Sequence, residues 1–294
     1  MKIGIIGKSI LTEEGKEFCF FLLDYLHNKG VEVYVQAGFY DLLKREKSNK
    51  KIGIRFENAE TNLVASFSVM LSLGGDGTLL ESLTVIKDTG IPVLGVNMGR
   101  LGFLANITKN DIYYAIDELL KGTYRLDQRS VLQFESEDNI FGNINFALND
   151  FVIHKNDTSA MVVIHTYINN EFLNSYWGDG LIVSTPTGST GYSLSCGGPI
   201  LFPRSNSFAV TPVSPHNLNV RPIIIPDNSV LTFEVEGRSS GFLASLDSRS
   251  VNADFNKRML LRKASFTLNL VHLEGNNYLK TLRTKLNWGL DSRN

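Results

Sequence analysis

The residues best suited to chemistry stand in a glycine-rich turn, Gly74-Gly75-Asp76-Gly77-Thr78. The apolar run 67–73 before this turn predicts a buried strand, and the run 79–86 after it predicts the start of a helix. Glycines let backbone N–H groups approach a phosphate closely, and a helix N-terminus favours anionic oxygens. Because a carboxylate there would repel that phosphate, we expect Asp76 to have a task of its own. Accepting a proton from a hydroxyl group and binding a metal ion are both such tasks.

A second segment is rich in hydroxyl groups. Seven Ser and Thr residues lie from Ser184 to Ser195, at the end of the strand-like run 180–184. Solvated loops are often rich in these residues, which is the simpler interpretation. Asp179 before the segment and Gly197-Gly198-Pro199 after it favour another interpretation. Hydroxyl groups and exposed amides suit the sugars and phosphates of a nucleotide.

Two further segments carry polar groups at the ends of expected strands. The segment 97–104 follows a buried strand-like run, and neighbouring strand ends of an open α/β sheet are where ligands bind. Within this segment, Phe103 could stack on a base or belong to the core. Arg100 could pair with a phosphate or be solvated. The pair Asn149-Asp150 interrupts an otherwise apolar strand. The alternative to a functional role for this pair is an ordinary strand end with turn-forming residues.

Several other motifs fail on their spacing. The run Gly4 to Ser9 ends like a Walker A loop, but the first glycine of that motif would fall on Lys2. The five histidines have no metal-ligand spacing, and Cys19 and Cys196 form no CxxC pair. The sequence therefore gives no reason to expect zinc.

Composition limits the class of protein. The 294 residues are 43% apolar and 20% charged, as in a globular chain. The formal net charge of −1 provides no general basic field for nucleic acid or an acidic membrane, so any anion site is local. The N-terminus has no signal-peptide pattern, and no apolar run approaches the length of a membrane span. We therefore expect a cytoplasmic protein with neither a nucleic acid nor a membrane as partner.

Strand and helix signals alternate in the first part of the chain. Such alternation predicts an α/β domain over residues 1–127, with a Rossmann-like parallel sheet covered by helices on both faces. The expected strands are 2–6, 31–35, 67–73 and 91–96, and the expected helices are 13–29, 41–46, the run from 79, and 109–121.

Strand signals dominate from about Arg129 onward. They predict an all-β domain over residues 128–274, with hairpin turns at Asn169-Asn170 and 237–239. The stretch Tyr278 to Leu286 is helical, and we expect the tail 275–294 to pack back on the first domain. The expected strands of the β domain are 131–134, 145–154, 161–168, 180–184, 230–236 and 257–272.

Taken together, these segments resemble the NAD kinase family. The resemblance rests on the runs 74–78, 97–104 and 185–195 and on the glycines that follow. It continues through Pro212-Val213-Ser214-Pro215-His216 and Arg221-Pro222 in the family's order. The glycine-rich turn alone is a weak signal, because phosphofructokinases and the diacylglycerol and sphingosine lipid kinases carry similar loops. The combination covers most of the chain and is specific.

The resemblance implies ATP-dependent phosphorylation of the 2′-hydroxyl of the adenosine ribose of NAD, which gives NADP. It also implies a homo-oligomer, a dimer or tetramer, and a divalent metal, expected to be Mg²⁺ held mainly by the ATP phosphates. By this similarity, Asp76 is the base that accepts the 2′-hydroxyl proton. The residues implied to line the ATP phosphates are Gly74, Gly75, Gly77 and Thr78.

The same similarity implies a set of NAD-binding residues. Asn149 and Asp150 would hold the ribose and adenine, Asp179 would bind towards the nicotinamide end, and Thr190 to Ser195 would wrap the dinucleotide. The full set is Asp76, Gly77, Phe103, Asn149, Asp150, Asp179, Thr187, Thr190, Gly191, Tyr192, Ser193, Leu194 and Ser195.

Two positions depart from the family pattern. The family usually has Asn-Glu at Asn149-Asp150, so the carboxylate here is shorter by one methylene. It often has Asp-Gly-Gln at Asp247-Ser248-Arg249, so Arg249 could instead reach a phosphate.

Two alternative functions remain open at this point. One is a lipid or sugar-phosphate kinase with the same loop, and the other is a dinucleotide-binding sensor without catalysis. The hydroxyl and carboxylate groups of Asp150, Asp179, Thr190 and Ser195 argue against an apolar acceptor groove. The intact Asp76 with its glycines argues against a sensor.

Overall fold

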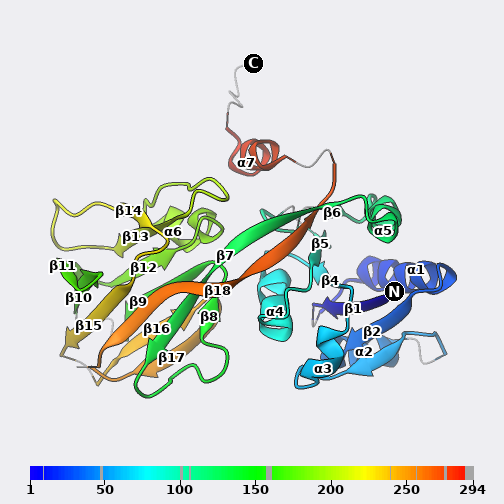
Figure 1. Ribbon diagram of the computed structural model, residues 1–294, viewed down its shortest axis with the longest axis horizontal. Coiled ribbons are helices and arrows are strands. Elements are labelled where there is room, and N and C mark those ends of the chain that lie inside the picture. The colour runs from blue at the N-terminus through cyan, green and yellow to red at the C-terminus, as the bar shows by residue number, and fades with distance from the viewer. Residues whose placement is uncertain are drawn as a thin grey trace. The chain divides into compact units, whose positions relative to one another are not determined.

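The chain forms two compact units (Figure 1). Unit 1 contains residues 1–127 and 268–294, and unit 2 contains residues 128–267. The computed structural model describes residues 1–8, 10–46, 49–99, 102–105, 107–156, 161–238, 240–255, 257–274 and 277–288. Arg100, for which phosphate pairing was one interpretation, lies outside the described residues.

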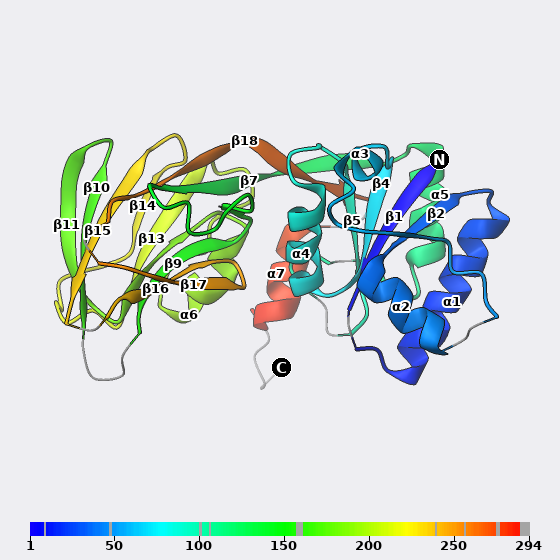
Figure 2. The ribbon, with the colours of Figure 1, turned by 90° about the horizontal axis from the view of Figure 1, so that it is seen from below.

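Unit 1 is built on a parallel sheet with the strand order β5-β4-β1-β2-β3. Residues of β4 and β5 are buried throughout, because helices cover both faces of the sheet (Figure 2). The strands are β1 (Lys2–Gly7), β2 (Glu32–Gln36), β3 (Ile54–Phe56), β4 (Val69–Gly74), β5 (Val93–Asn97) and the short β6 (Ile107–Thr108), which pairs with β5. The expected α/β architecture is confirmed.

The helices of unit 1 divide between the two faces of this sheet. On one face, α1 (Glu13–Asn28) and α5 (Ile112–Lys121) share a core cluster with the strands, including Leu22, Ile116 and Leu71. On the other face lies α4 (Asp76–Ile86), where a Cβ on Gly95 would come closer than 3.0 Å to the Leu79 side chain. The remaining helices are α2 (Ala37–Glu46), α3 (Thr61–Ala65) and α7 (Tyr278–Leu286).

Helix bounds follow local hydrogen bonds. The helix expected over 109–121 begins only at Ile112, because Thr108 and Asp111 close a turn before it. Thr108 Oγ1 donates to Asp111 Oδ2 at 2.6 Å, and Asp111 N donates to Thr108 O at 3.1 Å. The helix expected over 41–46 starts earlier, at Ala37, directly after β2.

The C-terminal part of the chain belongs to unit 1. Residues 268–274, which the sequence analysis assigned to the β domain, lie in unit 1 because Leu270 pairs in parallel with Val93 of β5. Helix α7 has the bounds expected from the sequence, and Lys285 Nζ lies 5.7 Å from the centre of the Phe103 ring. The tail therefore packs on the first domain, as expected.

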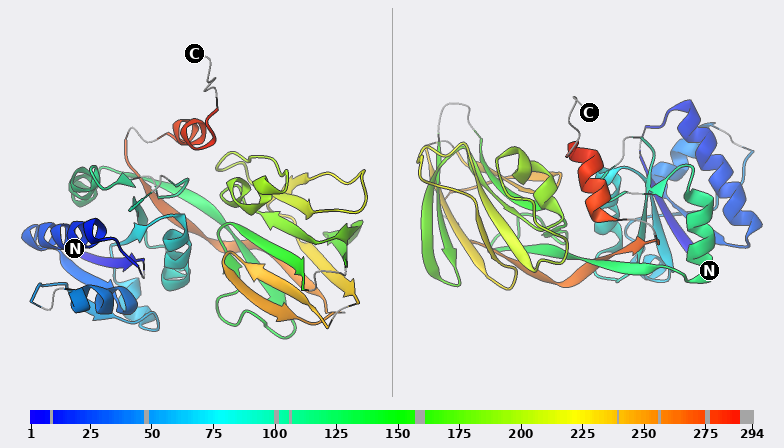
Figure 3. Two further views of the ribbon diagram at one scale, coloured as in Figure 1. Left: turned by 180° about the vertical axis from the view of Figure 1, so that it is seen from behind. Right: turned by 90° about the horizontal axis from the view of Figure 1, so that it is seen from above.

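Unit 2 contains two β-sheets. One has the order β14-β13-β12-β9-β16-β17, and the other contains β11-β10-β15-β18 with β7 and β8 alongside. The long strands β7 and β18 lie side by side (Figure 1 and Figure 3). Phe151 packs between Phe134 and Phe233, with ring centres 5.1 and 5.8 Å away. The strands are β7 (Arg125–Ser136), β8 (Phe146–Ala147), β9 (Asp150–Lys155), β10 (Val162–Ile168), β11 (Glu171–Gly178), β12 (Gly180–Ser184), β13 (Ser207–Val213), β14 (Ile223–Pro226), β15 (Leu231–Gly237), β16 (Phe242–Leu246), β17 (Arg249–Ala253) and β18 (Met259–His272).

Two connections in unit 2 test the turn predictions. Asn169 and Asn170 have φ of 51° and 69° and join β10 to β11, so the first hairpin is confirmed. The hairpin expected at 237–239 is wrong, because β15 pairs with β10 and β18 whereas β16 pairs with β9 and β17. That link connects the two sheets, and its Ser239 lies outside the described residues.

The strand expected over 145–154 is also divided. It breaks after Ala147 into β8 and β9, which belong to different sheets. Leu148 and Asn149 form the crossover, which brings Asn149 and Asp150 to the start of β9. No helix in the described part of the chain is long and apolar enough to cross a lipid bilayer.

Candidate functional site

The glycine-rich turn of unit 1 links β4 directly to α4. Gly75 precedes the helix in an extended conformation, with φ of −139°, and no side chain caps the helix. A Cβ on Gly74 would come closer than 3.0 Å to the Thr78 hydroxyl group, so this position requires glycine. A Cβ on Gly75 or Gly77 would meet nothing within 4 Å. The first turn of α4, whose N–H groups lack helical partners, thus has open space beside it.

The Asp76 carboxylate accepts three consecutive backbone hydrogen bonds. Phe103 N donates to Oδ2 at 2.8 Å, and Leu104 N and Ala105 N each donate to Oδ1 at 3.0 Å. A Cβ on Gly102 would come closer than 3.0 Å to the Asp76 carboxyl group, so glycine is needed there as well. Asp76 therefore anchors the segment 102–105 in addition to any chemical role.

The Phe103 side chain has a definite environment. It is half-buried, and the ammonium group of Lys285 from α7 lies over its ring. The amide of Asn97 supports the start of the same loop, because Gly99 N donates to Asn97 Oδ1 at 2.7 Å. Phe103 is thus neither a core residue nor a free aromatic ring.

In unit 2, a second carboxylate holds the crossover that carries Asn149 and Asp150. Asp247 Oδ2 accepts from Leu148 N at 2.9 Å, and Oδ1 accepts from Asn149 N at 2.7 Å and Asp150 N at 3.3 Å. Asp247 has a φ of 52°, in the turn between β16 and β17. Aspartate is one of the few residues that tolerates this conformation.

Arg249 does not have a free guanidinium group. Its two terminal nitrogens donate to the backbone carbonyls of Ile144 and Phe146, and its guanidinium carbon lies 5.8 Å from the Phe146 ring centre. These bonds use two of the five N–H donors of Arg249, and contact of this side chain with a phosphate stays a prediction.

The electrostatics around Asp150 are unusual. Burial, with a smaller contribution from the Asp247 carboxylate, raises the pKa of Asp150 to about 7. Burial also raises the pKa of Asp247, although its backbone hydrogen bonds and Arg249 act in the opposite direction. Asn149 Oδ1 is buried and has no hydrogen-bond partner among the described residues. Because buried polar atoms are nearly always paired, this oxygen is a candidate acceptor for a ligand N–H or O–H group.

Some hydroxyl groups of the hydroxyl-rich segment already form hydrogen bonds with other parts of unit 2. Thr185 Oγ1 donates to Leu148 O at 2.6 Å, and Ser193 Oγ lies 2.9 Å from Thr211 Oγ1. A Cβ on Gly188 would come closer than 3.0 Å to the backbone of Asn149, so the segment packs tightly against the crossover. The buried hydroxyl groups of Thr185 and Ser193 therefore fix the shape of the loop.

The remaining predicted residues of this segment differ in accessibility. Thr187 is buried and accepts a hydrogen bond of 3.3 Å from the buried Arg129. The half-buried or exposed residues, which a ligand could reach, are Thr190, Gly191, Tyr192, Leu194 and Ser195.

Tyr192 lies near two acidic residues of unit 2, Asp150 and Asp179. Burial is the largest cause that raises the pKa of Tyr192, and Cys196, Asp179 and Asp150 add to it. Asp179 Oδ1 also forms an ion pair of 2.7 Å with Lys155 Nζ. The fold thus brings Asp150, which lies earlier in the sequence, near enough to Tyr192 and Asp179 for the charges of both carboxylates to act on Tyr192.

Each unit therefore holds its own group of predicted residues. Gly74 to Thr78 and Phe103 lie in unit 1, and Asn149, Asp150, Asp179 and 187–195 lie in unit 2. Sequence patterns predicted no site role for Asp247, Arg129, Lys155 or Lys285. For Asp247 the available signal was an aspartate in a short turn between two alternating strands. No comparable signal marks the other three.

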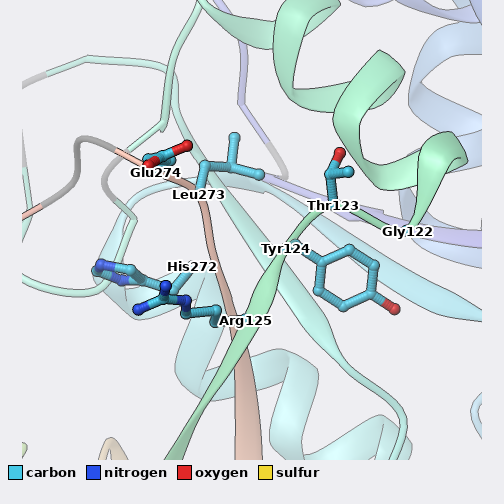
Figure 4. A pocket seen from close by; sticks show the side chains of 7 residues that line it. All are labelled: Gly122, Thr123, Tyr124, Arg125, His272, Leu273 and Glu274. Atoms are coloured by element: carbon cyan, nitrogen blue, oxygen red, sulfur yellow. The ribbon is translucent and has the colours of Figure 1, made fainter.

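A cavity of about 310 Å³ in unit 1 contains none of the predicted residues (Figure 4). It is lined by 122–125 and 272–274. In Figure 4 the Arg125 and His272 side chains extend to one side of the strands that carry them, and the Tyr124 ring extends to the other. Among the residues that the structure describes, no group of three or more His, Cys, Asp or Glu residues could hold a metal ion.

An α/β unit with a glycine-rich turn at a helix N-terminus, followed by a β unit with buried carboxylates and hydroxyl groups, suits a phosphotransferase. Comparison with protein families gives the family. The family model described as the ATP-NAD kinase N-terminal domain matches residues 3–124, and the ATP-NAD kinase C-terminal domain matches residues 148–273. The chain belongs to the ATP-NAD kinase family, as the sequence resemblance implied.

Individual relatives agree with this assignment. The chain is 50% identical over 273 residues to the NAD kinase of Cytophaga hutchinsonii, with 93% of each chain covered. Its fold is similar to that of yeast NADH kinase complexed with NADH, with a TM-score of 0.87, 24% identity, and coverage of 99% of this chain and 89% of that chain. It is also similar to an NAD kinase from Archaeoglobus fulgidus in complex with ATP, with a TM-score of 0.74, 20% identity, and 98% and 99% coverage. These comparisons do not support a lipid or sugar-phosphate kinase or a sensor.

Proposed function

We propose that this chain transfers the γ-phosphoryl group of ATP to the 2′-hydroxyl of the adenosine ribose of NAD, giving NADP. Family membership supports the reaction, and the observation that carries the mechanism is the glycine-rich turn. Asp76 begins α4 there, between two glycines that border open space.

The ATP phosphates are proposed to bind along Gly74, Gly75, Gly77 and Thr78. The open positions at Gly75 and Gly77 let phosphate oxygens approach the backbone, and the N-terminus of α4 favours their negative charge. Gly74 acts differently, because it makes room for the Thr78 side chain.

Asp76 is proposed as the base. A carboxylate offers about four acceptor positions, and three of those on Asp76 take backbone N–H groups. A position remains for the proton of the 2′-hydroxyl. As that proton moves to Asp76, the ribose oxygen bonds to the γ-phosphorus and the bond from phosphorus to the ADP oxygen breaks. The backbone contacts hold the carboxylate in one orientation, which phosphoryl transfer requires.

We propose that Mg²⁺ enters mainly with the ATP phosphates. The three N–H groups on Asp76 leave its carboxylate little room to act as a metal ligand as well. When bound, the metal neutralises charge on the transferring phosphoryl group.

NAD is proposed to bind to the acidic group of unit 2. Asn149 Oδ1 offers a buried acceptor without a partner among the described residues, which suits an adenine amino group or a ribose hydroxyl. Asp150 and the run from Thr190 to Ser195, in which Ser193 is buried, supply further contacts, with Asp179 towards the nicotinamide end. Contacts of NAD with Gly77, Phe103 and Thr187 remain predictions from the family resemblance.

A homo-oligomer, a dimer or tetramer, located in the cytoplasm is also proposed. Phe172 and Trp177 on the edge strand β11 are 56% and 48% exposed, which supports a protein partner at that edge. Light scattering after size-exclusion chromatography should give a mass of two or four chains, and a mass of one chain would contradict this.

The assay that tests the function couples NADP formation to an NADP-specific dehydrogenase, with NAD, ATP and Mg²⁺ as reactants. We expect NADP in proportion to enzyme. NAD binding without NADP would favour a sensor, and transfer from labelled ATP to a lipid or a sugar phosphate would favour the other alternative. A parallel reaction with polyphosphate identifies the donor.

A further inference from the structure

The proposed function does not explain why the Asp247 carboxylate accepts three backbone hydrogen bonds. This carboxylate accepts the N–H groups of Leu148, Asn149 and Asp150, which are 97 to 99 residues away in the sequence. Hydrogen bonds to a charged acceptor are among the stronger ones. This one side chain therefore holds three consecutive N–H groups of the backbone that presents Asn149 and Asp150.

Arg249 holds the same stretch of chain from its other end. Its guanidinium group donates to the carbonyl oxygens of Ile144 and Phe146, before the crossover. On the far side of the crossover, Thr185 N donates to Asn149 O at 2.9 Å. Between these contacts the segment 144–150 has little freedom to move.

We propose that Asp247 is a positioning residue for the NAD subsite: its carboxylate fixes the backbone of 148–150 and thereby the directions of the Asn149 and Asp150 side chains. Arg249 completes this clamp by holding 144–146. The inference rests on the proposed function, because it takes Asn149 and Asp150 as NAD contacts. Neither Asp247 nor Arg249 itself needs to touch NAD.

The same geometry gives Asp247 an electrostatic influence on Asp150. Both carboxyl groups are desolvated, and the Asp247 charge adds to the effect of burial on the pKa of Asp150, which is about 7. The other groups that act here are Arg249, whose charge opposes that of Asp247, and Tyr192, which lies near both Asp150 and Asp179. Removing the charge of Asp247 should therefore lower the pKa of Asp150.

The test compares Asp247→Asn with a matched control, Asp254→Asn. Asp254 lies in the same unit, its side chain is 76% exposed, and its nearest charged partner is Lys257 at 3.5 Å. We expect Asp247→Asn to raise KM for NAD about ten- to a hundredfold, because the backbone N–H groups of 148–150 lose hydrogen bonds to a charged acceptor. The KM for ATP and kcat at saturating NAD should stay within about threefold, because chemistry on bound NAD is untouched. The control should match the wild type.

A pH profile separates positioning of the site from general loss of structure. In the wild type, a plot of kcat/KM for NAD against pH should show a transition with its midpoint near pH 7. In Asp247→Asn the midpoint of this transition should move about one pH unit lower. Asp150→Asn should abolish the transition, which identifies its source. A folded Asp247→Asn variant with unchanged KM for NAD and an unchanged midpoint overturns the proposal.

Two further measurements keep the test decisive. If Asp247→Asn does not fold, Arg249→Met takes its place, and we expect KM for NAD to rise about three- to tenfold through loss of two charge-assisted bonds. An unchanged KM in that variant counts against the clamp. If the wild type makes no NADP, the proposed function fails, and calorimetric Kd values for NAD in the same variants still decide the positioning role.

Discussion

Asp76 in unit 1 and Asp247 in unit 2 use the same local device in different surroundings. Each carboxylate accepts three consecutive backbone N–H groups, from Phe103 to Ala105 in one case and from Leu148 to Asp150 in the other. Asp76 stands at a helix N-terminus beside glycines that border open space. Asp247 is desolvated and acts on a second carboxyl group.

The difference shows that a hydrogen-bond pattern alone does not reveal a residue's role. At Asp76, open space next to a rigidly held carboxylate permits a reacting hydroxyl group to approach. At Asp247, the neighbours are protein groups, so the same bonds serve to orient Asn149 and Asp150. We therefore propose a chemical role for Asp76 and a positioning role for Asp247, and the predictions below test these roles and the contacts around them.

The largest effect is expected from Asp76→Asn. The amide oxygen can still accept two of the three backbone bonds, but the side chain can no longer take a proton. We expect kcat to fall about 100- to 10,000-fold, equivalent to about 3–5 kcal/mol, with KM for NAD within about tenfold. Asp88→Asn, an exposed position after α4, is the control and should keep full activity. Near-normal turnover of Asp76→Asn would mean that another group is the base.

The next effect concerns pH and Asp150. Its pKa is about 7 in the folded protein, above its ordinary 3.8, so the folded state holds a proton that the unfolded chain has released. Asp150 therefore contributes to the free energy of unfolding. This contribution is complete below about pH 4 and is lost as the pH rises through about 7. At about 1.4 kcal/mol per unit, the loss is at most about 4 kcal/mol. Urea unfolding at pH 4.5 and pH 8 should show a smaller difference for Asp150→Asn than for the wild type. Equal differences would contradict this.

A smaller effect is expected from Gly102→Ala. The new Cβ would overlap the Asp76 carboxyl group, which must then move or break its bonds to 103–105. We expect a loss of about 1–3 kcal/mol in stability and a fall in kcat of about tenfold or more. Gly99→Ala is the matched control, because its Cβ would meet nothing within 4 Å. If both variants behave alike, the packing of Asp76 against Gly102 is unimportant.

The smallest effect is expected from Lys285→Ala. An exposed cation over an aromatic ring contributes about 0.5–1 kcal/mol, so removing Lys285 should destabilise the contact of α7 with Phe103 by about that amount. Chemical denaturation would measure it, with Lys280→Ala on the exposed part of the same helix as the control. A loss equal to that of the control would show that the contact contributes nothing.

Local signals predicted much of the fold and the glycine-rich turn. A buried strand, a Gly-Gly-Asp-Gly-Thr turn and a helix occur in adjacent positions, so sequence spacing alone located Asp76 at the start of α4. Helix α7 has the bounds of the stretch expected to be helical, and in the structure the Asn277 side chain caps it by accepting from Leu279 N. Such features depend on neighbours within a few residues.

Features that depend on distant contacts could not be predicted. The partners of Asp247 are 97 to 99 residues away, and those of Arg249 are 103 and 105 residues away. Alternation of apolar residues predicted the strand 145–154 but not its division between two sheets, because periodicity does not specify partners. The contact of Lys285 with the Phe103 ring likewise could not be predicted, because only the folded chain brings the two side chains together.

The most direct test of the contrast is a kinetic comparison of Asp76→Asn and Asp247→Asn, with NAD varied at saturating ATP and Mg²⁺. We predict that Asp76→Asn loses kcat while KM for NAD changes little. For Asp247→Asn we predict the reverse, a raised KM for NAD with kcat near that of the wild type. The account is contradicted if both variants change the same parameter, or if each changes the parameter assigned to the other.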